Sequence, residues 1–167
     1  MQFFWQRLEQ ISLRFTPAAL TVLMVLFAAV PLRVPGVGQV TPVFTLINIY
    51  YWGIFLPGAL PYAFIFILGF LQDTLMGTPH LFSSGINIAF ALMLTTERRH
   101  FGQNLFGTLW LGFISLSFLA LLLSWIVMSL RLRTYFPTSG LILQWSVTCL
   151  AYPLMHLMLT RIYRWIR

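Results

Sequence analysis

Long apolar runs follow one another along almost the whole chain, separated by short polar segments or by segments that contain proline and glycine. Some runs reach the roughly 20 residues that a helix needs to cross a bilayer, and others are shorter. The pattern predicts an all-α, polytopic integral membrane bundle of about six spans, forming a single domain over residues 1–167. The predicted spans are 17–34, 43–56, 62–76, 82–96, 105–130 and 141–159.

Residues 1–15 form an amphipathic segment ahead of the first span. Its apolar residues recur at helical spacing on one face: Phe4, Leu8, Ile11 and Phe15. This spacing predicts a helix that lies in the membrane interface, and the alternative is an extension of the first span. The segment lacks the pattern of a cleaved signal peptide, so we expect it to be mature sequence.

The second and third runs are short and are joined through a proline hinge. The run 43–56 has roughly fourteen residues, or about 21 Å of helix, which is less than the ~30 Å thickness of the hydrocarbon core. Pro57 and Pro61, with Gly58 between them, prevent one continuous helix through 43–76. Two arrangements remain open: a pair of short, tilted spans, or a re-entrant hairpin shielded by its neighbours.

Composition and charge support the membrane prediction. Hydrophobic residues make up 59% of the chain and charged residues 8%, which is too apolar for a water-soluble protein. The arginines flank the apolar runs and form no basic stripe, which argues against nucleic-acid binding. With both termini cytoplasmic, only Arg33, Arg131 and Arg133 of the 10 basic residues lie outside, as the positive-inside rule requires.

Patterns of catalytic or metal-binding chemistry are missing from the sequence. It contains no H-E-x-x-H, no G-x-S-x-G and no phosphate-binding glycine pattern. The Ser83-Ser84-Gly85 step and His156 invite comparison with an intramembrane serine protease, but Leu81-Phe82 stands where a glycine should precede the nucleophile. With three acidic residues, no ligand-spaced histidines and a single cysteine, Cys149, we expect no enzyme activity, metal, cofactor or disulfide.

A few polar residues stand inside the apolar runs. Asp73 has three possible roles: organising the outer turn through bonds to N–H groups of the loop, binding a partner helix, or relaying a proton or ion. Asn48, Asn87 and Gln144 are expected to form hydrogen bonds with neighbouring helices. His156 is expected to be a packing residue.

One stretch of the sequence resembles a known family. Tyr50-Tyr51-Trp52 is followed by Leu56-Pro57 and Pro61, and then by a G-x-x-x-D-x-x-x-G-x-P pattern of Gly69, Asp73, Gly77 and Pro79. These residues resemble the rod-shape-determining membrane protein family MreD. The chain departs from many relatives at His80-Leu81-Phe82, where a small or Leu-Gly step is usual.

The resemblance implies a non-enzymatic scaffold of the bacterial elongation machinery, multi-pass in the inner membrane, that supports peptidoglycan synthesis. Its fold would be similar to the membrane substrate-binding subunits of energy-coupling-factor transporters. The expected partner is the single transmembrane helix and juxtamembrane segment of MreC, and through it MreB, RodZ, RodA and a class B penicillin-binding transpeptidase. The alternative function is a substrate-binding membrane subunit of a vitamin or small-molecule transporter. We expect the partner to contact Tyr50, Tyr51, Trp52, Gly53, Pro57, Gly58, Gly69, Asp73, Gly77 and Pro79.

Overall fold

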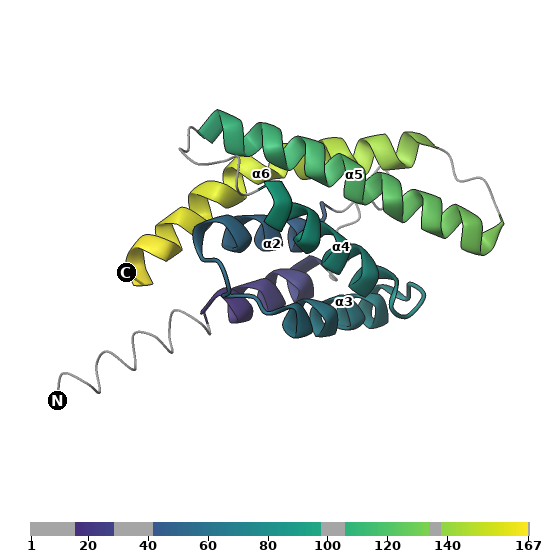
Figure 1. The fold of residues 1–167 in the computed structure, drawn as a ribbon, viewed down its shortest axis with the longest axis horizontal. Helices are drawn as coiled ribbons and strands as arrows, with labels where there is room; N and C mark the ends of the chain where they lie inside the picture. Colours follow the sequence, from purple (N-terminus) through teal and green to yellow (C-terminus); the bar gives the residue numbers. More distant parts are fainter. Residues whose placement is uncertain (1–15, 29–41, 98–105, 134–137, 167) are drawn as a thin grey trace.

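In a computed structural model of the protein, the described residues are 16–28, 42–97, 106–133 and 138–166, and these ranges contain helices and no strand (Figure 1). The helices are the N-terminal helix Thr16–Ala28, α2 Phe44–Phe55, α3 Tyr62–Met76, α4 Phe82–Glu97, α5 Phe106–Leu132 and α6 Thr138–Ile166. The all-α prediction is confirmed, and helices lie where the five apolar runs from residue 43 onward predict them. The amphipathic segment 1–15 and residues 29–34 of the first run lie outside the described residues.

The helix α6 is longer than its apolar run, because it continues from Leu159 to Ile166. Arginine is a good helix former, so Arg161 and Arg164 do not interrupt the helix. Their positive charges also suit the C-terminal end, where the unpaired carbonyls carry partial negative charge. The apolar run therefore marks only the part of α6 that is compatible with a membrane interior.

The short helix α2 lies at the centre of the fold (Figure 1). Every residue from Thr45 to Trp52 is buried, and α4, α5 and α6 all pack against the helix. A helix that is buried on all sides needs no polar face, which explains why α2 shows no amphipathic pattern. The core around it consists of Leu46, Ile47, Ile49, Tyr50, Ile65, Phe90, Ala91, Leu94, Phe113, Leu116, Ala120 and Tyr152.

The helix α3 packs mainly against α4, although the proline hinge led us to group α3 with α2. The helix α4 also contacts α2 and α5, so it holds the two hinged helices together. One direct link between α2 and α3 lies far from the hinge, where the Thr45 hydroxyl donates to Gln72 Oε1 at 3.1 Å. The hinge therefore reverses the chain direction, whereas the packing of α3 is set by its contacts with α4.

The helix α6 contains a proline in its interior, and a neighbouring helix satisfies the carbonyl that the proline leaves unpaired. Pro153 has no N–H, so it cannot bond the carbonyl of Cys149 four residues earlier. The indole N–H of Trp110 on α5 donates to that carbonyl at 3.3 Å. This bond fixes α5 against the middle of α6, where a second indole, that of Trp145, donates back to Ile114 of α5 at 3.3 Å.

Candidate functional site

The three consecutive aromatic residues of the expected partner site lie inside the molecule. Tyr50, Tyr51 and Trp52 are at most 1% exposed. The Tyr50 hydroxyl donates to the carbonyl of Leu109 at 2.7 Å, and that of Tyr51 to Thr160 Oγ1 at 3.2 Å. These rings hold α2 to α5 and α6, so they form core contacts and leave no face for a partner.

Gly69 lies where the backbones of α3 and α4 approach closely. A Cβ atom at this position would overlap the Cα and N atoms of Ser84. The Ser84 hydroxyl donates to the carbonyl of Phe66 at 2.9 Å, which ties the two helices together at the same level. A small residue on one helix and a hydroxyl on the other are typical of helix pairs in membranes, where backbones approach closely.

The carboxylate of Asp73 lies at the N-terminal end of α4 and is fully buried. Its oxygens accept the backbone N–H of Ser83 at 3.0 and 3.1 Å, and the hydroxyl of Thr78 at 2.7 Å. Ser83 is in the first turn of α4, where N–H groups have no helical partner and the helix dipole favours negative charge. Of the three roles considered for Asp73, the structure shows the one that organises the turn.

The turn between α3 and α4 completes this hairpin. Gly77 ends α3 with φ +67°, a left-handed conformation that glycine adopts without strain. Its N–H donates to the carbonyl of Asp73, as does the N–H of Thr78 at 3.1 Å. Pro79 accepts the N–H of Phe82 at 3.2 Å. The pattern formed by Gly69, Asp73, Gly77 and Pro79 thus builds the α3–α4 hairpin itself.

Two serines that complete the hairpin, Ser83 and Ser84, were not among the predicted site residues. They were considered only as a possible nucleophile, whereas each contacts α3 directly. A usable signal was present: Asp73 lies ten residues before Ser83, across a Gly-x-Pro turn. In this chain, that spacing lets the Asp73 carboxylate reach the first turn of the following helix.

The remaining residues of the expected site line an apolar groove between α2, α3 and α4. Gly53, Pro57 and Gly58 contribute to it, and its volume is about 270 Å³. Pro57 and Gly58 are exposed in the hinge, and Gly58 has φ +90°. The full lining is Ile49, Gly53, Leu56, Pro57, Gly58, Leu60, Pro61, Tyr62, Ile65, Ala91, Leu94 and Thr95.

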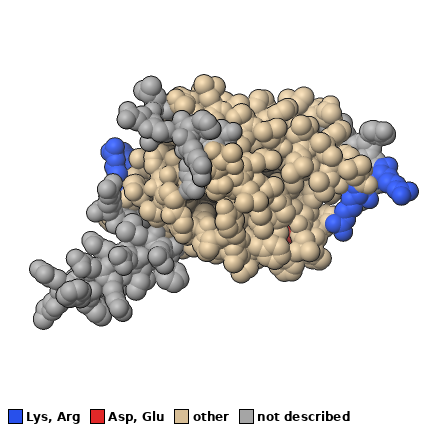
Figure 2. Space-filling view, in the orientation of Figure 1, with Lys and Arg blue, Asp and Glu red and all other residues tan. Residues whose placement is uncertain are grey.

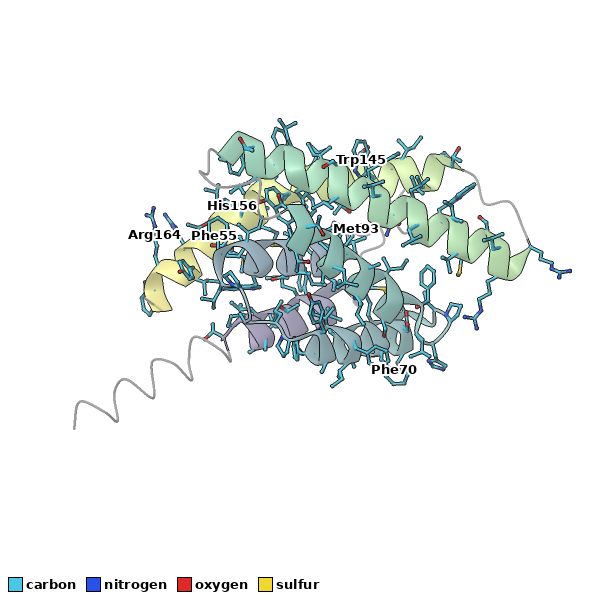
Figure 3. All side chains as sticks on the ribbon, in the orientation of Figure 1. Phe55, Phe70, Met93, Trp145, His156 and Arg164 are labelled. Atoms are coloured by element: carbon cyan, nitrogen blue, oxygen red, sulfur yellow. The ribbon has the colours of Figure 1, made fainter. Side chains whose placement is uncertain are left out.

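His156 lies among aromatic rings, as expected of a packing residue. Its ring centroid is 5.1 Å from that of Phe106, 5.4 Å from Tyr51 and 5.7 Å from both Tyr152 and Phe55 (Figure 3). The described part of the chain contains no group of three or more His, Cys, Asp or Glu that could hold a metal ion. Asn48 donates to the carbonyl of Phe44 within its own helix at 2.9 Å, so the expected bond from Asn48 Nδ2 to another helix is absent among the described residues.

The outer surface of the described chain is apolar along its length and charged at its ends. On the face drawn in Figure 2, arginines lie at the two ends of the long axis, and the described residues between them are uncharged apart from one small acidic spot. The described helices other than α2 all expose large apolar side chains, among them Phe27, Ile67, Leu92, Leu111 and Leu154. Among the described residues, two helices are long and apolar enough to cross a membrane: Phe106–Arg131 and Thr138–Trp165, with mean hydropathies of 2.3 and 1.3.

Comparisons with known proteins identify no relative of the chain. No protein-family model, curated protein or solved structure matches the chain.

Proposed function

We propose that the protein is a multi-pass membrane protein with both termini in the cytoplasm, which acts as a non-enzymatic scaffold of the rod-shape machinery. The exposed apolar side chains support a membrane location, since water-soluble monomers seldom expose such large contiguous apolar areas. The elongation role is supported by the resemblance of residues 50–79 to the MreD family.

The direction of α3 favours two short spans over a re-entrant hairpin. Leu56 and Leu60 of the hinge pack in a cluster with Tyr163, near the basic end of α6. At the other end of α3, Phe82 shares a groove with Met128 of α5 and Gly140 of α6. The 15 residues of α3 thus run from one end of the bundle towards the other, which a hinge in mid-membrane would not allow.

The apolar groove between α2, α3 and α4 is the surface that we assign to the partner. It is the single observation that carries the scaffold proposal, because Gly53, Pro57 and Gly58 of the expected site line it. An α-helix is about 10 Å across with its side chains, so the groove accepts side chains of a partner helix and not the whole helix. In lipid, such close packing is what holds helices together. The partner is the single transmembrane helix of an MreC-type protein.

Co-purification of this partner with two matched variants tests the assignment. Thr95 lines the groove, whereas its neighbour Thr96 is exposed outside it. Thr95→Trp fills the groove, and we expect recovery of the partner to fall at least tenfold. Thr96→Trp adds the same side chain to the same helix and should leave recovery unchanged. Equal recovery with both variants would contradict the assignment.

A further inference from the structure

The C-terminal end of α6 presents basic and aromatic side chains on one face. Arg161, Arg164 and Trp165 are spaced i, i+3, i+4, so they project from the same side of the helix. All three are exposed, and Trp165 is 94% exposed. Figure 3 shows Arg164 at the free end of the helix, near the C-terminus. Together with Ile162 and with Thr16 of the N-terminal helix, they line a hollow of about 560 Å³.

The same face of α6 continues as an apolar strip towards the middle of the helix. Leu154, Leu157 and Met158 precede Arg161 by seven, four and three residues, and they are 70%, 68% and 43% exposed. The face thus changes from apolar to basic within one helical turn. An anionic phospholipid has a matching arrangement, with apolar acyl chains next to a negatively charged phosphate.

The positive charge at this end lacks a described counter-ion. Of the three acidic residues in the sequence, only Asp73 has a described side chain. Its carboxylate already accepts hydrogen bonds from Ser83 and Thr78 in the α3–α4 hairpin. The partial negative charge at the end of a helix is about half a unit, which is less than the two charges of Arg161 and Arg164.

We propose that this face of α6 binds an anionic phospholipid, with Arg161 and Arg164 on the phosphate and the acyl chains along Leu154, Leu157 and Met158. Guanidinium groups donate paired hydrogen bonds to phosphate oxygens, and exposed tryptophan favours the headgroup level. Anionic lipids of the cytoplasmic leaflet provide the ligand. This proposal rests on the membrane location proposed above and is independent of the partner.

Native mass spectrometry of the full-length protein in detergent tests the site. We expect phosphatidylglycerol to bind more tightly than phosphatidylcholine, and R161Q/R164Q to weaken phosphatidylglycerol binding roughly tenfold. The matched control R131Q/R133Q removes two arginines from the opposite end of the bundle and should bind as the wild type does. Circular dichroism of each variant verifies that the helices are intact.

Three outcomes would overturn the proposal: no preference for phosphatidylglycerol, equal binding by R161Q/R164Q and the wild type, or an equal loss in the control. Displacement of the lipid by millimolar inorganic phosphate would also overturn it, since the site would then hold free phosphate. Recovery of the partner with Thr95→Trp is a separate measurement. Failure of the lipid site is therefore distinguishable from failure of the scaffold proposal.

Discussion

The Asp73 carboxylate connects two helices and the turn between them. It belongs to α3, accepts the Ser83 N–H of α4 and accepts the Thr78 hydroxyl of the turn. Inside a membrane an isolated carboxylate is costly, and these donors together with the dipole of α4 offset that cost. Such a residue stabilises its own chain, so losing it affects folding before it affects any partner.

Replacing Asp73 with asparagine removes the charge while keeping the size of the side chain. The amide oxygen can still accept the Ser83 N–H, but it is a single neutral acceptor, because the amide nitrogen that replaces the other carboxylate oxygen cannot accept. We therefore expect the free energy of unfolding to fall by about 1 to 3 kcal/mol. Unfolding by sodium dodecyl sulfate, followed by circular dichroism, measures this change. Thr74→Val is the control, because the Thr74 hydroxyl bonds only within its own helix. An unchanged midpoint for Asp73→Asn would contradict the role assigned to the carboxylate.

Substituting alanine for each of two glycines in the α3–α4 hairpin should change the free energy of unfolding in opposite directions. At Gly69 the new methyl group meets the backbone of Ser84, and the forced separation of the helices should cost about 1 to 3 kcal/mol. At Gly85, inside α4, the methyl group meets nothing within 4 Å, so the higher helix propensity of alanine should stabilise by up to about 1 kcal/mol. The same unfolding assay compares them. If both variants had the stability of the wild type, the close approach of α3 and α4 would be wrong.

At the scale of helices, the sequence predicts where they lie and does not predict how they pair. Apolar runs and prolines were enough to place α2 to α5 within a few residues of their ends. The sequence does not predict which helices pack against each other, because most of their faces are apolar. A face that contacts lipid therefore looks the same in the sequence as a face that contacts protein. The contacts that select α4 as the partner of α3 come from small features, Gly69 against Ser84 and Asp73 against Ser83. Of the expected partner site, the groove residues Gly53, Pro57 and Gly58 stay a prediction.

The contact between Trp110 and the proline in α6 can be tested with a double-mutant cycle. Trp110→Phe leaves the Cys149 carbonyl without its indole donor, which should cost about 1 to 3 kcal/mol. In a Pro153→Ala background, the alanine N–H can bond that carbonyl, so the same substitution should cost less. The difference is the coupling energy of the two sites. Equal costs in both backgrounds would show that the indole does not replace the missing helix bond.

At the scale of the whole molecule, the two ends of the bundle differ in the segments that they bring together. The hinge between α2 and α3 lies near the C-terminal end of α6. The α3–α4 turn lies near the C-terminal end of α5 and the N-terminal end of α6. If the helices cross the membrane, the hinge and the turn are on opposite sides. With both termini in the cytoplasm, as proposed above, the hinge is on the cytoplasmic side.

Cysteine labelling distinguishes two crossings from a re-entrant hairpin. Pro57 is exposed in the hinge, and a cysteine there, in a Cys149→Ser background, should react with an impermeant reagent from the cytoplasmic side only. Ala59 is a poorer choice for this experiment, because it is 6% exposed. His80→Cys, in the α3–α4 turn, should react from the outer side only. Protection of the Pro57 cysteine on the cytoplasmic side would favour re-entry.

The central claim is that the groove between α2, α3 and α4 receives the transmembrane helix of an MreC-type protein. Photo-crosslinking in living cells tests it most directly, with a benzophenone amino acid at Tyr62, which lines the groove and is 47% exposed. The same amino acid at Phe118 of α5, 38% exposed and outside the groove lining, is the control. We predict an adduct with the MreC-type protein from Tyr62 and none from Phe118. An adduct from Phe118 alone, or lipid adducts alone at both positions, would contradict the claim.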